Sequence, residues 1–417
     1  MTARHERPWG TVGLAAFLLL ASSVVMPTLL GLLAVEVTRD LDVGDRGLGS
    51  VIAGFWLVTA VASPLCGRWA DGRGWRHGAT TGAAVVAACL LSCVLLVDSW
   101  AGLVVVFGVA GVGYALCSPT SNLLVVSGVP APRRASVLGF KQTAPPVLTA
   151  LAGATLPALA HAYGWRPAML LGLALPVSVL VMVTALGGVQ HPPALRERGV
   201  RDRASEPSGA GSEPGPMRPM PVVAAAGLGT LSVATVTGFA VLTLVGAGVA
   251  PVLAASIVSG GSMLAVLARL FAGAYLDARP AGDLAPLVWL MAVAAVGIGA
   301  TAVGLFGGEL APGGAWVVVV AVGVVVSLVA AWTWPALLLI AVVRRARGPG
   351  AASGLLQMGS GVGSAIGPLV FGLLSDAGGR GWAWLVMVGS TVLAMHFVRI
   401  AGRSSSRVAE GVTVAAR

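Results

Sequence analysis

The sequence predicts an all-α membrane protein in which twelve transmembrane helices form two six-helix bundles. Composition, the number of apolar runs and the placement of the arginines support this fold class. Of the 417 residues, 57% are hydrophobic and only 10% are charged, far more apolar than a soluble domain of ordinary composition. One crossing of the bilayer core takes roughly 20 apolar residues, so the chain is long enough for a dozen crossings joined by short loops.

Twelve apolar runs, separated by charged residues or by clusters of glycine and proline, are predicted to be these helices. The expected spans are Thr11–Val37, Gly47–Cys66, Gly78–Val97, Ala101–Ser127, Ser136–Ala162, Arg166–Val189, Val222–Gly246, Ala250–Ala274, Leu284–Gly307, Gly314–Val343, Ala351–Ser375 and Trp382–Ala401. The first run is too long for a signal peptide, so we expect it to be retained. The predicted organisation is an N-terminal segment 1–10, a bundle 11–189, a polar linker 190–221, a bundle 222–402 and a tail 403–417.

The arginines indicate how the chain is oriented. An even number of helices places both termini on one side, and all but four of the 26 basic residues fall in loops or helix ends on that side. The exceptions are Arg39, Arg46, Arg166 and Arg380. Because positively charged loops stay in the cytoplasm, we expect a multi-pass protein of the cell inner membrane with the termini and the linker cytoplasmic.

Other classes of protein find little support. The net charge of +10 does not indicate a nucleic-acid-binding protein, because the arginines lie in short loops between apolar runs. The four cysteines lie inside apolar runs, so no disulfide or metal site is expected. The five histidines have no neighbouring acid or metal-ligand spacing, and we expect neither an enzyme nor a cofactor. A channel or a sensor is a further alternative.

Two short segments recur in the second half of the chain. Segment 66–71 (CGRWAD), which ends the second helix, aligns with segment 272–277 (AGAYLD), which ends the eighth. Segment 139–142 (GFKQ) in the fifth helix aligns with segment 354–357 (GLLQ) in the eleventh. Matches at equivalent positions of two six-helix units indicate a duplication whose halves are related by an axis along the membrane normal.

The loop after the second helix carries Gly67, Asp71, Arg73, Gly74 and Arg76. This spacing resembles a loop signature of the major facilitator superfamily, and with the duplication the resemblance covers residues 11 to 401. It implies the major facilitator fold and a secondary transporter that moves a small solute by alternating access. Gly67 is expected to permit close helix packing, Gly74 a tight turn, and Asp71 hydrogen bonds from the arginines. These residues would latch a cytoplasmic gate, unless the charges only solvate a turn and fix the topology.

A partial copy of this motif is expected at Gly273, Asp277 and Arg279. Arg269, in the helix just before it, is expected to snorkel or to act as a latch rather than to bind substrate.

The fifth helix carries a second, narrower resemblance. Residues 132–135, 139–142 and 164–166, with Pro145, Gly153 and Pro157, resemble a bacterial subgroup that includes cyanate-permease-like anion carriers. This resemblance implies a small organic or inorganic anion as substrate. Drug or multidrug efflux is the alternative, but Phe107 stands where proton-coupled exporters of the superfamily usually carry an arginine.

Lys141 is the only lysine in the chain. It is expected roughly 8 Å into the fifth helix, where it either faces the central cavity with Gln142 and attracts an anion or snorkels to the interface. None of the sixteen acids lies in the middle of an apolar run. An anionic or neutral solute is therefore favoured over a cation.

The remaining substrate-binding candidates are Asn122, Gln357, Trp56 and Trp332, which are polar or aromatic residues at unusual depth. Hydrogen bonding between helices is the alternative for the two amides, and packing or interface anchoring for the two tryptophans. The expected partners are a small-molecule substrate and the lipid bilayer. A proton is the candidate coupling ion, uniport is the alternative, and the chain is expected to act as a monomer.

Overall fold

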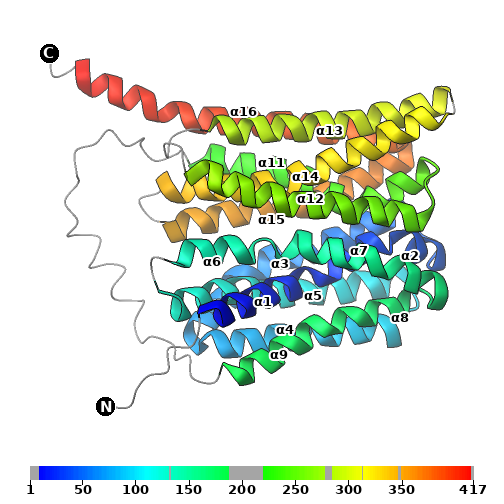
Figure 1. The fold of residues 1–417 in the computed structure, drawn as a ribbon, viewed down its shortest axis with the longest axis horizontal. Helices are drawn as coiled ribbons and strands as arrows, with labels where there is room; N and C mark the ends of the chain where they lie inside the picture. The colour runs from blue at the N-terminus through cyan, green and yellow to red at the C-terminus, as the bar shows by residue number, and fades with distance from the viewer. Residues whose placement is uncertain are drawn as a thin grey trace.

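The computed structural model describes residues 9–130, 133–186, 219–277, 284–311, 313–345 and 349–414. Within these ranges the chain forms a bundle of long helices (Figure 1). The elements are α1 (Trp9–Leu32), α2 (Ala34–Asp40), α3 (Asp45–Arg73), α4 (Trp75–Leu95), α5 (Trp100–Gly128), α6 (Arg134–Lys141), α7 (Ala144–Tyr163), α8 (Trp165–Met169), η2 (Leu170–Leu173), α9 (Ala174–Ala185), α11 (Pro219–Gly246), α12 (Pro251–Asp277), α13 (Ala285–Leu310), α14 (Gly314–Arg345), α15 (Pro349–Gly378) and α16 (Arg380–Val414).

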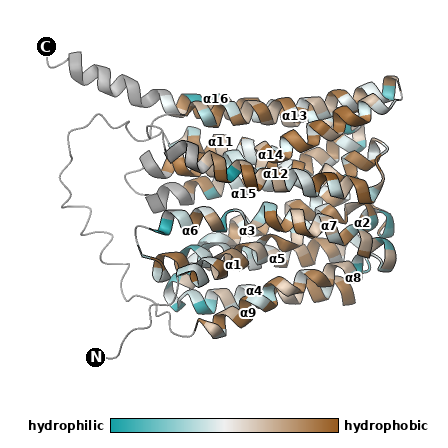
Figure 2. Ribbon diagram, viewed as in Figure 1, coloured by the Kyte–Doolittle hydropathy of each residue, from teal (hydrophilic) through white to brown (hydrophobic). Residues whose placement is uncertain are grey.

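Twelve spans in the described ranges are long and apolar enough to cross a membrane. Hydrophobic residues cover most of the length of these helices (Figure 2). Large aliphatic side chains such as Val61, at 69% exposure, and Val296, at 70%, lie on the outer surface. Water does not tolerate so much exposed apolar surface, whereas lipid does. The predicted fold class and helix count are therefore confirmed.

The helices form two groups, α1 to α9 and α11 to α16, which lie against each other (Figure 1). The contacts between the groups pair α3 with α15, α7 with α12, and α1 with α11. The chain enters α1 and leaves α16 at the same end of the bundle, which we call the termini end, and the opposite end is the far end.

Several helices differ from their predicted spans. The first span ends at Leu32, and a separate short α2 follows it. The sixth span contains the 3₁₀ segment η2 between α8 and α9. The predicted tail 403–417 begins as a continuation of α16, which runs to Val414. Most of the predicted linker lies outside the described residues, as do residues 1–8.

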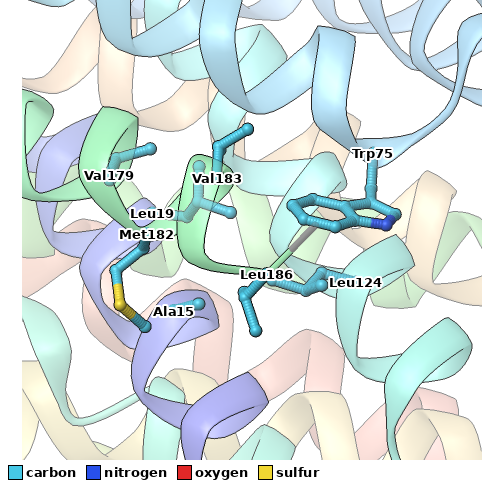
Figure 3. Close-up of a pocket in the computed structure, with 8 residues that line it drawn as sticks. All are labelled: Ala15, Leu19, Trp75, Leu124, Val179, Met182, Val183 and Leu186. Carbon is cyan, nitrogen blue, oxygen red and sulfur yellow. The ribbon is translucent and has the colours of Figure 1, made fainter. Parts of the chain in front are cut away.

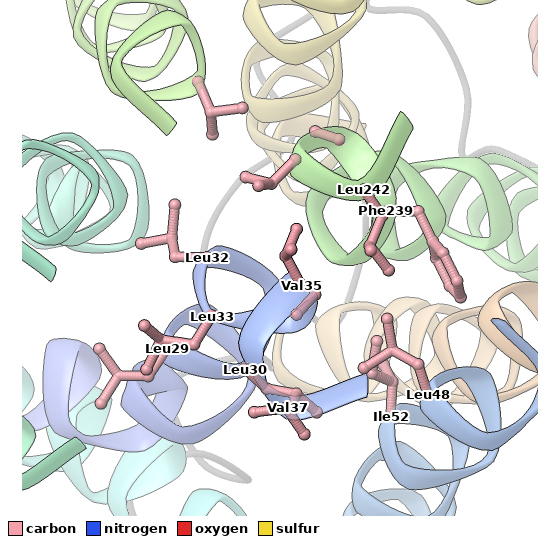
Figure 4. Packing of buried hydrophobic residues seen from close by; sticks show 14 of the residues in the cluster. Leu29, Leu30, Leu32, Leu33, Val35, Val37, Leu48, Ile52, Phe239 and Leu242 are labelled. Atoms are coloured by element: carbon pink, nitrogen blue, oxygen red, sulfur yellow. The ribbon is translucent and has the colours of Figure 1, made fainter. Parts of the chain in front are cut away.

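The apolar core is organised differently at the two ends. One cluster joins both halves at the far end, where side chains of α1, α2 and α3 such as Leu30, Val35 and Ile52 meet Phe239 and Leu242 of α11 (Figure 4). Toward the termini end, one cluster belongs to the first half and another to the second. The halves are therefore packed together at the far end and have separate cores at the termini end.

Candidate functional site

The fifth span is broken at the predicted lysine. Helix α6 ends at Lys141 and α7 begins at Ala144, with the turn residues Gln142 and Thr143 between them. The cause lies in the next two residues, because Pro145 and Pro146 have no N–H to donate to the carbonyls four residues earlier. The missing bonds are those to Lys141 and Gln142, so the break leaves backbone acceptors free beside the lysine.

The Lys141 side chain is only 1% exposed and turns toward α5. Its Nζ donates a 2.6 Å hydrogen bond to Ser121 Oγ and another to Asn122 Oδ1. The Lys141 stem therefore does not run along the lipid surface. Within the described residues, no carboxylate forms an ion pair with Lys141. An ammonium group has three donors, so one N–H of Lys141 remains after the two neutral partners are satisfied.

Arg269, in α12 of the second half, reaches the broken span of the first half. Its Nη1 donates to the Gln142 carbonyl and its Nε to the Trp332 carbonyl in α14. Gln142 lies four residues before Pro146, so its carbonyl is one that a proline leaves without an intrahelical donor, whereas the carbonyl that Pro335 releases in α14 is that of Ala331, next to Trp332. Because carbonyls released by proline need another donor inside a membrane protein, an arginine is well suited to this position. Arg269 thus connects the halves, which agrees with a latch role, one of the two alternatives expected for this residue from the sequence.

Trp332 contributes a donor as well as a carbonyl. Its indole Nε1 is buried and has no hydrogen-bond partner among the described residues. A buried N–H without a partner is costly. Together with the unused N–H groups of Lys141 and Arg269, this region offers several donors, and neither basic group forms an ion pair within the described residues. Such a region suits a ligand rich in acceptor atoms.

A second group of candidate residues lies along one face of α5. Tyr114, Ser118 and Asn122 are spaced by four residues in α5 and so share one face. The Tyr114 phenol lies within hydrogen-bonding reach of Ser118 and of Gln357 in α15. Asn122 and Gln357 are both exposed. Since the stripe contacts both Lys141 and α15, it faces the interface between the halves.

Trp56 joins this stripe through ring contacts. Its centroid lies 5.1 Å from that of Tyr114 and 5.1 Å from that of Phe55, both in edge-to-face geometry. The rings meet because Gly111 of α5 touches the α3 backbone, where a Cβ at Gly111 would lie 2.4 Å from the Phe55 carbonyl oxygen. The structure therefore links Trp56 to Gln357 through Tyr114. It places Asn122 against Lys141 and joins Gln142 to Trp332 through Arg269.

The loop motif has a different arrangement from that expected. Gly74 adopts a φ of +88°, which only glycine takes easily, and closes the turn between α3 and α4 as the sequence predicted. Arg76 donates a 3.2 Å hydrogen bond to the Leu186 carbonyl. Asp71 is exposed, and among the described residues it forms no ion pair with Arg73 or Arg76. Arg73 lies instead 5.2 Å from the Trp69 ring centroid.

Close packing at Gly67 is not found. A Cβ added at Gly67 would meet nothing within 4 Å, so this prediction is wrong. Close approach of α3 occurs instead at Gly49, where a Cβ would lie 2.2 Å from the Pro368 carbonyl oxygen of α15. The tight contact needed between the halves lies at the far end of α3, and the motif lies at its opposite end. In the second-half copy, the surroundings of Gly273, the Asp277 side chain and the whole of Arg279 lie outside the described part of the chain.

A small apolar pocket lies inside the first half, near the termini end (Figure 3). Its lining is Ala15, Leu19, Trp75, Leu124, Val179, Met182, Val183 and Leu186. Most of these are aliphatic side chains from a single half, so the pocket does not provide a path between halves. Among the described residues, no group of three or more His, Cys, Asp or Glu side chains is placed to hold a metal.

The far end carries a polar contact between the halves. Asp45 at the start of α3 receives hydrogen bonds of 2.7 and 2.9 Å from the Arg380 guanidinium at the start of α16. Ser375 donates to the same carboxylate, and Arg380 also donates to the Leu242 carbonyl. Two of the four arginines that the sequence placed on this side, Arg166 and Arg380, thus form ion pairs.

These features define a multi-pass membrane transport protein whose two similar six-helix halves meet around polar and basic side chains. The chain belongs to the Major Facilitator Superfamily, whose family model matches residues 12–298. It is therefore a transporter of small molecules and not an enzyme.

Solved structures share the fold. A bacterial homologue of the human lysosomal transporter Spinster, in an inward-facing and unoccupied conformation, has 17% identity and a TM-score of 0.67, covering 97% of this chain and 99% of that chain. A variant of the nucleoside transporter NupG has 13% identity and a TM-score of 0.65, covering 94% of this chain and 99% of that chain. Identities this low show the fold alone. No curated protein matches this chain.

Sequence reasoning missed Tyr114, Ser118 and Ser121 and gave Arg269 no part in the candidate site. The four-residue spacing of Tyr114, Ser118 and Asn122 is a readable signal, because it marks one face of an otherwise apolar helix. The position of Arg269 has no such signal. Its contact with Gln142 depends on how the two halves pack, which a single sequence does not reveal.

Proposed function

We propose that this chain is a secondary active carrier of a small anion, which binds between the halves at Lys141 and Arg269. The observation that carries this proposal is that a basic side chain from each half is found at the break in the fifth span, where Lys141 ends α6 and Arg269 donates to the carbonyl of the next residue, Gln142. Their partners in the described residues are a hydroxyl, an amide oxygen and two backbone carbonyls. Buried charges without a counterion are costly, so a bound anion would relieve both.

The resemblance of the fifth helix to the cyanate-permease-like subgroup supports the same substrate class. A neutral solute fits less well, because it would leave the two positive charges uncompensated. The monomer is the proposed working unit, since one chain supplies both basic residues. We place the termini end in the cytoplasm of the inner membrane on the arginine distribution, and we take a proton as the coupling ion.

Alternating access supplies the proposed mechanism. With the halves packed at the far end, the site would be reached from the termini end, and an anion would draw Lys141 and Arg269 together. Charge neutralisation would favour a tighter termini end, after which the far-end contacts could part. The Gly67–Arg76 motif and its copy in 273–279 are proposed to bias this step at the cytoplasmic surface.

A thermal-shift panel on the purified chain in detergent tests the proposal. Acetate, benzoate, cyanate and phosphate represent anions, glycerol and uridine neutral solutes, and tetraphenylphosphonium a drug-like cation. We expect stabilisation by at least one anion, and saturable uptake of that anion into proteoliposomes that responds to an imposed pH gradient. Stabilisation by the cation alone would favour drug efflux and contradict an anion site.

The charge at position 141 is tested on the anion that the panel identifies. Lys141→Gln is expected to weaken binding about 10- to 100-fold, because a hydrogen bond to a charged group contributes about 1.5–3 kcal/mol. Lys141→Arg, the matched control, keeps the charge and should retain much more affinity. Equal binding by wild type and Lys141→Gln, with both folded by size-exclusion chromatography, would refute the site.

A further inference from the structure

The aromatic cluster of Phe55, Trp56 and Tyr114 lies on the face of the interface that also holds Lys141. Tyr114 and Asn122 are eight residues apart in α5, or about 12 Å along the helix axis at 1.5 Å per residue. Asn122 binds the Lys141 ammonium, and Ser118 lies between the two on the same face. A continuous stripe therefore runs from three aromatic rings to a positive charge.

The cluster differs from ordinary core packing. Phe55 is completely buried, but Trp56 and Tyr114 are only half-buried, although they belong to the middle of α3 and α5. The Tyr114 phenol is satisfied partly by Gln357 of the other half, which is itself exposed. These two rings thus form the edge of the far-end core, at the level where the halves begin to separate into their own cores.

The chemistry along the stripe changes from apolar to basic. Helix α5 carries no charged residue over Trp100–Gly128, and α3 carries its charges only near its two ends. The ring end therefore offers edge and face contacts to an apolar, flat group, and the other end offers N–H donors to an anionic group. Aromatic groups favour the edge-to-face contacts that Trp56 and Tyr114 already make with each other.

We propose that the carried anion is an arylalkanoate, with its ring against Trp56 and Tyr114 and its carboxylate at Lys141 and Arg269. The separation of about 12 Å along α5 calls for several atoms between ring and carboxylate once both contact distances are subtracted. This inference rests on the proposed anion site, and it adds to that site a selective subsite for the ring.

Competition binding on the full-length chain in detergent tests the ring subsite, with acetate, 4-phenylbutyrate and 4-cyclohexylbutyrate as probes. We expect 4-phenylbutyrate to bind at least 10-fold more tightly than acetate. The saturated analogue has nearly the same size but no π face, and we expect it to bind several-fold more weakly than 4-phenylbutyrate. Equal binding of the two ring compounds would overturn the aromatic subsite.

Substitutions separate this inference from the proposed function. Trp56→Leu should weaken the binding of 4-phenylbutyrate much more than that of acetate, and Tyr114→Phe should keep the preference for 4-phenylbutyrate because it keeps the ring. Trp289→Leu is the matched control, because Trp289 is 66% exposed on α13. Lys141→Gln should weaken both carboxylates.

The binding results distinguish failure of the ring subsite from failure of the anion site. If acetate and 4-phenylbutyrate bind equally and both depend on Lys141, the ring subsite is refuted and the anion site stands. If Trp56→Leu and Trp289→Leu lower 4-phenylbutyrate binding equally, the ring subsite is also refuted. If neither carboxylate depends on Lys141, the anion site itself is refuted.

Discussion

At the far end the two halves share one apolar core, whereas at the termini end each half has its own. The far end adds backbone contact between α3 and α15 at Gly49 and Gly372 and the ion pair of Asp45 with Arg380. Toward the termini end, the long side chain of Arg269 reaches across to the Gln142 carbonyl. In this conformation, the two halves are therefore held together mainly by the contacts at the far end. Transport requires those contacts to be reversible, and polar and glycine contacts separate more easily than interlocked large side chains.

The largest effect on the opening of the far end is expected from adding a methyl group at Gly49, where α3 contacts α15. Gly49→Ala would place a Cβ 2.2 Å from the Pro368 carbonyl oxygen. Both helices must then move apart, which costs about 3 kcal/mol, at the upper end of the range for overpacking, because the obstacle is backbone. Reaction of Ile52→Cys with a membrane-impermeant maleimide, in a Cys66→Ser background, measures the opening of the far end.

Gly54→Ala is the matched control, since its Cβ would make only an ordinary contact with Val104, at 3.7 Å, in the same helix. It should leave the reaction at Ile52→Cys unchanged. If Gly49→Ala also leaves that reaction unchanged, the far end is not held by the contact of α3 with α15.

A smaller effect on the opening of the far end is expected from loss of the ion pair between Asp45 and Arg380. Asp45→Asn removes the charge that Arg380 contacts, while Arg380 remains 28% exposed and can turn to water. We expect the far-closed state to lose about 1.5–3 kcal/mol, the range for hydrogen bonds to charged groups. A double-mutant cycle of Asp45→Asn with Arg380→Gln, read by the same maleimide reaction, isolates the pair. Additive effects would show that the two residues act separately.

The smallest effect is expected at Asp40, whose ion pair with Arg166 stays within one half. The Trp165 indole and the Arg166 guanidinium both donate to this carboxylate and lower its pKa below the ordinary value. A lowered pKa in the folded state means that the stabilisation is present at neutral pH and is lost as the pH falls below about 4. Because the carboxylate is 43% exposed, solvent screening keeps its contribution below about 1 kcal/mol.

Thermal unfolding of Asp40→Asn between pH 7 and pH 3 measures this contribution. The variant should melt slightly below wild type at pH 7, and the difference should shrink as the pH falls below about 4. Asp42→Asn, an exposed acid two residues later, is the control. A difference that grows as the pH falls would contradict the sign of the pKa shift. The far-end maleimide reaction should not change, because no contact between halves is lost.

The sequence predicted the membrane fold well because lipid imposes a simple rule. A span must satisfy its own backbone and expose apolar side chains, and both requirements are visible in runs such as 314–342. Helix breaks were harder to place. Pro145 and Pro146 were visible, yet the interruption at Gln142 became clear only in the structure, because prolines within spans do not always break them. Pro27, for example, lies inside the continuous helix α1.

The sequence alone determined the number of spans and the single lysine, and it predicted the duplication and the linker, because these depend on composition and on order along the chain. Only the tertiary structure decided that Arg269 reaches Gln142, that Tyr114 meets both Trp56 and Gln357, and that α3 is tightly packed at Gly49 and not at Gly67. Each of these is a contact between helices far apart in sequence. Such contacts depend on how two helices are rotated and displaced against each other, and a nearly uniform apolar surface records little of that information in one sequence.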